Sequence, residues 1–164
     1  MRGTINGTNS GATGEPGAPR HGYCFPDSDS FVSSVWHRWT ALQSGRFEIK
    51  IGSTSARLVL ALYPGSDLGN LGSGTYDLTR LYDHRTELGI RVRAGSTYRI
   101  AVASTTSSRS TFGLEWSLAP APANDDFTNA QNLAGDTGTF SATLSTATAE
   151  ANEPGHSDLT GSAA

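Results

Sequence analysis

Short stretches of the chain alternate apolar and polar residues, and most of them end in a turn rich in glycine or serine. Between positions 46 and 52, Phe47, Ile49 and Ile51 alternate with charged residues. This period of two is typical of an antiparallel strand with one face in a core and the other in solvent. The stretch 57–63 is instead almost continuously apolar, which suits a strand covered on both faces. We expect strands at 3–10, 31–41, 46–52, 57–63, 75–83, 87–93, 97–104 and 111–118.

The richest apolar stretch runs from 34 to 40 and holds two of the three tryptophans. Alternation places Val35, His37 and Trp39 on one face and Trp36 on the other, so it predicts a central strand. No helical period accompanies these strands. The pattern therefore predicts an all-β antiparallel sandwich, with at most one short helical turn near 126–133.

Composition changes this picture only a little. The chain has 164 residues, which suits one domain, or one domain and a fragment. A net charge of −3 and scattered basic residues argue against a nucleic-acid surface. The single cysteine, Cys24, cannot form an internal disulfide. No apolar run is long enough to span a bilayer, and the first residues lack the apolar core of a signal peptide, so we expect neither in this piece.

The chain also repeats its own beginning. Residues 3–21 and 138–156 share nine identities in nineteen ungapped positions, at a constant shift of 135. We interpret this as a tandem repeat that starts and ends out of phase. We expect a first sandwich at 1–118 that lacks its opening strand, an Ala/Pro linker at 119–123, and the opening of a second unit at 124–164. In this interpretation 124–140 completes the sandwich, in cis or in a neighbouring chain, and 146–164 is loosely held.

An ordered set of motifs runs through most of the chain. They are ANDDFTNA at 123–130, Glu-x-x-x-Pro-x-His at 15–21 and 150–156, SVWHRWT at 34–40, LALYPGS at 60–66 and AGSTYRIAV at 94–102. In this order they resemble bacterial pre-peptidase C-terminal (PPC-like) domains. The resemblance implies a jelly-roll-like sandwich that serves as a non-catalytic, extracellular accessory module, often in tandem. Related collagenase domains bind calcium and a protein ligand. Many such domains have an Asp-rich loop where this chain has only one acid, at 81–85.

Calcium prefers six to eight oxygen ligands from loops. Asn124, Asp125 and Asp126 lie together before a polar turn, and Glu15 or Glu150 could join them in a calcium site. The alternative is that Asn124 or Asp125 caps a helical turn at 127–133 by accepting a backbone N–H.

Other chemistry finds little support in the sequence. The four histidines lack the spacing of a zinc site, and no Gly-x-Ser-x-Gly elbow is present. Trp36, Trp39 and Trp116 could stack on sugars, but alternating tryptophans in strands more often belong to a core. We expect no enzyme and no nucleic-acid partner. The favoured function is an extracellular module that binds an unidentified protein or polysaccharide; the alternatives are a structural spacer repeat or a carbohydrate-binding module.

Overall fold

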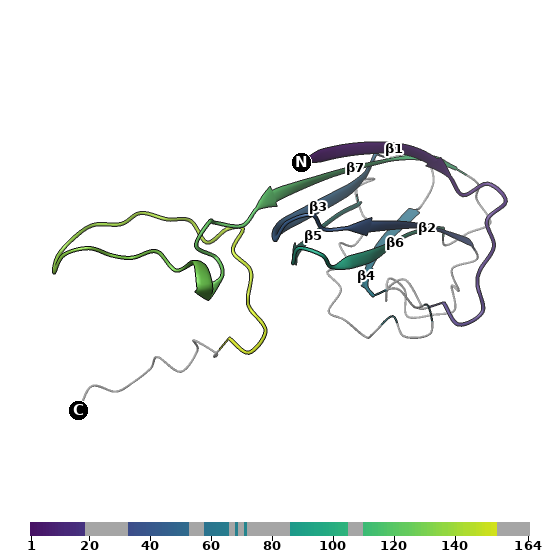
Figure 1. The fold of residues 1–164 in the computed structure, drawn as a ribbon. Helices are drawn as coiled ribbons and strands as arrows, with labels where there is room; N and C mark the ends of the chain where they lie inside the picture. The colour runs from purple at the N-terminus through teal and green to yellow at the C-terminus, as the bar shows by residue number, and fades with distance from the viewer. Residues whose placement is uncertain are drawn as a thin grey trace, which may run out of the picture.

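The computed structural model confirms an all-β sandwich and describes residues 1–18, 33–52, 58–65, 68, 71, 86–104 and 110–153. Two antiparallel sheets pack face to face (Figure 1). The four-stranded sheet has the order β1-β7-β3-β5, and the three-stranded sheet has the order β2-β6-β4. The strands are β1 (Arg2–Thr8), β2 (Ser33–Thr40), β3 (Gly45–Gly52), β4 (Leu58–Pro64), β5 (Thr86–Val92), β6 (Thr97–Ser104) and β7 (Thr111–Pro120).

Apolar residues that alternate with polar ones in the sequence are buried in the structure. In β3, Phe47, Ile49 and Ile51 are buried and the residues between them face outward. The side chains of β4 from Leu58 to Tyr63 are all buried, as the continuous apolar run predicts. The two sheets differ in the burial of their outer faces. The side chains of β4 are buried on both faces, whereas the outer face of the four-stranded sheet carries polar side chains.

The tryptophan-rich strand β2 borders the core. Trp39 stacks on Phe47 of the opposite sheet, with ring centroids 3.9 Å apart. Trp36 points the other way and lies beside Tyr63 at 5.7 Å. Both tryptophans pack against buried clusters rather than forming an open stacking platform. The strand was expected to be central, but it lies at one end of the strand order of its sheet among the described residues.

His37, on the inner face of β2, meets Phe112 edge-on at 6.2 Å. Its Nε2 atom is buried and has no hydrogen-bond partner among the described residues. Burial disfavours the charged imidazolium, so it lowers the pKa of His37 from the ordinary value of 6.5. The sequence predicts a neutral, hydrogen-bonded histidine at the core or edge of the sandwich; the lowered pKa favours the neutral form, but Nε2 lacks the expected hydrogen bond among the described residues.

The segment after the sandwich does not complete the sandwich in cis. β1 already pairs with β7 over seven residues, from Arg2↔Ser117 to Thr8↔Thr111. Residues 124–140 form no strand in cis; they extend away from the sandwich as an exposed segment (Figure 1). The first two linker residues, Ala119 and Pro120, belong to β7. Pairing of 124–140 with a neighbouring chain stays a prediction.

The helical turn is shorter than expected. A single 3-10 turn covers Phe127–Asn129, and the residues up to 133 do not continue it. The expected strand at 75–83, the cysteine Cys24, the histidines at 21, 84 and 156, and residues 154–164 lie outside the described residues. Within the part of the chain that is described, no helix is long and apolar enough to cross a membrane.

Candidate functional site

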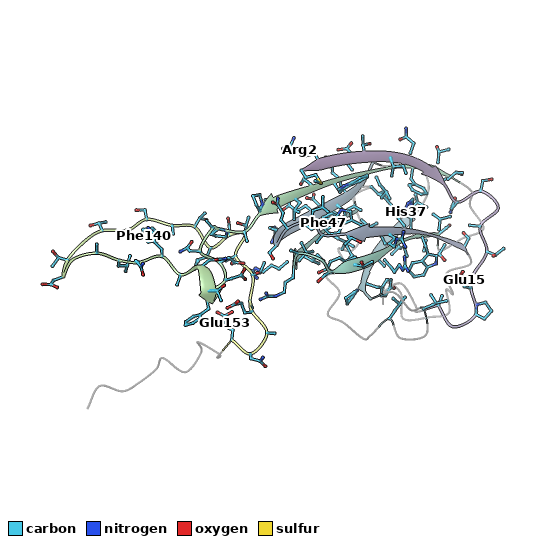
Figure 2. All side chains as sticks on the ribbon, viewed as in Figure 1. Arg2, Glu15, His37, Phe47, Phe140 and Glu153 are labelled. Atoms are coloured by element: carbon cyan, nitrogen blue, oxygen red, sulfur yellow. The ribbon has the colours of Figure 1, made fainter. Side chains whose placement is uncertain are left out.

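The residues singled out as calcium ligands come together only in part. Asn124, Asp125 and Asp126 lead into the 3-10 turn, and Glu150 lies beside them. Glu15 belongs to the loop after β1, at the other end of the sandwich from Glu153 and this turn (Figure 2). The structure therefore brings four of the five residues to one place and excludes Glu15 from it.

The 3-10 turn is capped, but not by the residues that the sequence suggested. Asp126 occupies the N-cap position and makes no side-chain capping hydrogen bond. The backbone N–H of Phe127 instead donates to Oε2 of Glu150 at 2.9 Å. The prediction of a local cap from Asn124 or Asp125 is wrong, because a carboxylate from 23 residues further along the chain satisfies this amide.

Asp125 binds a residue close to Glu150 in the chain. Its Oδ1 accepts the backbone N–H of Thr148 at 2.8 Å, and its Oδ2 accepts the Thr148 hydroxyl at 2.6 Å. Charge-assisted bonds of this length are stronger than neutral ones. We call the Asp125–Thr148 and Phe127–Glu150 contacts the staple. The staple thus ties Thr148 and Glu150 to the residues around the 3-10 turn, and the loose hold expected of 146–164 stays a prediction.

A positively charged side chain of the sandwich, Arg93, lies beside the staple. The guanidinium of Arg93, just after β5, lies 3.8 Å from Oδ1 of Asp126 and donates a hydrogen bond to the carbonyl oxygen of Ala149. Arg93 thus contacts both sides of the stapled segment. Nothing in the sequence distinguishes Arg93 from its neighbour Arg91.

This donor set does not fit calcium. Both oxygens of Asp125 and one oxygen of Glu150 already accept hydrogen bonds, and Asp126 faces a guanidinium that would repel a divalent cation. No group of three or more His, Cys, Asp or Glu side chains that could hold a metal ion occurs among the described residues. The geometry favours a structural role for these acids.

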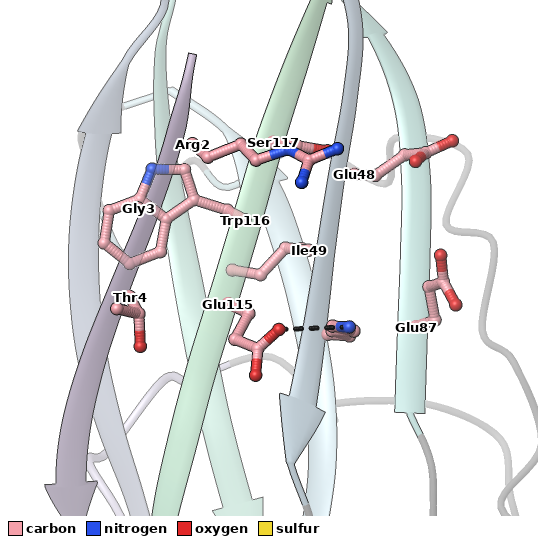
Figure 3. Close-up of a pocket in the computed structure, with 10 residues that line it drawn as sticks. Arg2, Gly3, Thr4, Glu48, Ile49, Glu87, Glu115, Trp116 and Ser117 are labelled. Carbon is pink, nitrogen blue, oxygen red and sulfur yellow. Dashed lines mark ion pairs between the residues drawn. The ribbon is translucent and has the colours of Figure 1, made fainter.

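A second feature lies on the outer face of the four-stranded sheet, where a groove of about 490 Å³ crosses β1, β7, β3 and β5 (Figure 3). We call it the sheet groove. Thr4, Glu115, Lys50 and Glu87 lie side by side across it, because the registers pair each with the next. The full lining is Arg2, Gly3, Thr4, Glu48, Ile49, Lys50, Glu87, Glu115, Trp116 and Ser117.

Charges of both signs line the sheet groove. Nζ of Lys50 lies 3.0 Å from Oε2 of Glu115, and this ion pair is drawn as a dashed line in Figure 3. These side chains are more than half exposed, at 54% and 57%, so water screens the pair and it contributes little to stability. The exposed charges are therefore accessible to a partner.

Trp116 reaches the edge of this groove, but its ring is covered. Gly3 pairs with Trp116 in the register of β1 and β7. A Cβ atom on Gly3 would lie 2.2 Å from Cζ2 of the indole, so the glycine backbone rests against the ring. The indole also packs against the core. It does not offer the open face that stacking on a sugar needs.

The sequence predicts that the charges between 46 and 52 face outward, but it does not show which charges of other strands lie beside them. Comparison with known proteins adds no assignment: the chain matches no protein-family model and no curated protein.

Proposed function

We propose that the chain is a non-catalytic binding module of a larger secreted or cell-surface bacterial protein, and that the sheet groove receives its ligand. The observation that carries the proposal is the groove itself, which lines an exposed sheet face with charges from four strands. Residues on rigid strands hold their spacing better than residues on loops, which suits recognition. The extracellular location is part of this proposal, and its support is the resemblance to PPC-like domains.

The lining favours a polypeptide ligand over a polysaccharide. Arg2, Lys50, Glu48, Glu87 and Glu115 offer donors and acceptors of both signs, which complement a peptide with alternating charges. Sugar sites rely on an exposed aromatic face, and Gly3 covers Trp116. The carbohydrate-binding alternative therefore has the weaker support.

A binding screen tests this proposal. The chain is immobilised and exposed to collagen peptides, charged peptide libraries and a glycan array. The variant Lys50→Ala/Glu115→Ala removes the central ion pair, which should cost at most about 1 kcal/mol of stability. We expect it to weaken binding of the selected peptide at least about tenfold, or about 1.4 kcal/mol.

Arg91→Ala is the matched control, because Arg91 is an exposed residue of the same sheet that does not line the groove. Equal loss in both variants would overturn the assignment of the sheet groove as the binding site, because Arg91 lies outside it. Selection of glycans alone would overturn the peptide ligand. Hydrolysis of any panel member by the purified chain would overturn the non-catalytic assignment.

A further inference from the structure

The chain leaves the sandwich as a continuation of β7, not as a free linker. Gly45 of β3 pairs with Pro120, and the N–H of Ala121 then donates to the carbonyl of Ser44 at 2.9 Å. Each residue whose backbone is paired in this way loses conformational freedom. The direction in which the next segment departs is therefore set by the sheet.

Arg93 fixes the same segment from a second side. Its guanidinium meets the Asp126 carboxylate before the 3-10 turn and the Ala149 carbonyl on the returning strand of the loop. A planar guanidinium with several donors can hold two acceptors in one geometry, which a lysine cannot do as well. Ser44 and Arg93 come from neighbouring turns of the sandwich, since the hydroxyl of Ser44 accepts the N–H of Ala94 at 3.2 Å.

The staple closes the segment on itself. Asp125 holds Thr148, and Glu150 holds the amide of Phe127, so residues 128–147 form a loop with a fixed base. At the shift of 135, Thr148 and Glu150 correspond to Thr13 and Glu15 of the first unit. Both loop-side residues of the staple thus recur at the opening of each unit, as a repeated joint requires.

We propose that the staple, Ser44 and Arg93 form an ordered joint between successive units of a tandem array, and that Arg93 is the residue by which one sandwich orients the next. The partner is the following copy of this repeat. Residues 137–143 correspond to β1 at the same shift, and Phe140 is 54% exposed. The joint holds this segment away from its own sandwich (Figure 1), in position to pair with the following unit's counterpart of β7. The inference rests on the tandem-repeat interpretation and not on the sheet groove.

A distance measurement between two spin labels tests the joint. Labels are placed at Ser10→Cys and Ser141→Cys, both exposed positions, in a Cys24→Ser background. Double electron–electron resonance should give one narrow distance peak. Arg93→Ala should at least double the width of that peak, and Arg91→Ala, two residues away on the same chain segment, should leave it unchanged.

A broad distribution in the parent, or an unchanged peak in Arg93→Ala, would overturn the proposal. Circular dichroism melting of each variant shows whether the sandwich itself stays folded.

Amide hydrogen exchange tests the staple separately. Glu150→Ala removes the acceptor of the Phe127 N–H, and we expect that amide to exchange at least about tenfold faster. Asp136→Ala, at an exposed position in the loop, should leave the rate at its parental value. Exchange of Phe127 at the unprotected rate in the parent chain would refute the staple. Neither experiment contains a ligand, so the joint and the binding proposal can fail independently.

Discussion

The same substitution, glycine to alanine, should affect stability differently at two equivalent positions of the repeat. Gly3 and Gly138 are equivalent at the shift of 135. A Cβ atom on Gly3 would lie 2.2 Å from Cζ2 of Trp116, whereas a Cβ on Gly138 meets no atom within 4 Å. Neither glycine has a positive φ, so alanine fits the backbone at both positions. Gly3→Ala and Gly138→Ala therefore separate the packing of β1 on β7 from the general effect of replacing glycine.

The size of the effect follows from the overlap. Carbon atoms in contact lie about 3.5 Å apart, so the indole or β1 must move by at least about 1.3 Å from the 2.2 Å approach. Overpacking of this kind costs about 1–3 kcal/mol, and the lower entropy of the unfolded alanine chain offsets about 0.4–1 kcal/mol of it. We expect Gly3→Ala to lose about 1–2 kcal/mol net and Gly138→Ala to stay within about 0.5 kcal/mol of the parent.

Thermal unfolding followed by tryptophan fluorescence measures this difference. At about 2–4 °C per kcal/mol for a domain of this size, the Tm of Gly3→Ala should fall by about 2–8 °C. Exchange of the β1 amides shows whether the strand has detached or the indole has moved. Equal Tm values for the two variants would refute the packing of Gly3 on Trp116.

Two further predictions concern protons and calcium. The lowered pKa of His37 means that the unfolded chain binds a proton more readily, so the stability from this residue is fully present above pH 6.5 and is lost as the pH falls below it. Urea unfolding from pH 8 to pH 5 should show a steeper loss for the parent than for His37→Gln; parallel curves would contradict this. Calcium added at millimolar level should leave the Tm unchanged relative to EGTA, because the acids around Asp125 and Asp126 are engaged by Thr148 and Arg93. A calcium-dependent rise in Tm that disappears in Asp125→Asn would show that these acids bind the ion.

The helical turn shows why local patterns mislead at a loop. The sequence of 124–126 favoured a local cap, because Asn and Asp commonly accept the first free amides of a helix. The amide of Phe127 is instead satisfied by Glu150. A cap from a distant residue has no local sequence pattern, so only folding of the whole segment reveals it.

For the strands that the structure describes, the sequence alone determined where they lie and which faces are buried. Alternation of apolar and polar residues is a local property. It places Phe47, Ile49 and Ile51 on one face of β3, and that face is buried because removal of apolar side chains from water is favourable. The continuous apolar run of β4 likewise predicted its burial on both faces. The sandwich follows from the number and spacing of such strands.

Tertiary structure alone decided which residues meet. Glu15 and Glu150 have matching neighbours in the sequence, yet only Glu150 reaches the turn at Phe127. Lys50 and Glu115 became partners through the order β1-β7-β3-β5, which joins strands far apart in the chain. Arg93 looked like one more solvated charge until the chain path placed Asp126 and Ala149 against it. Contacts of this kind depend on long-range strand pairing, which a local period cannot encode.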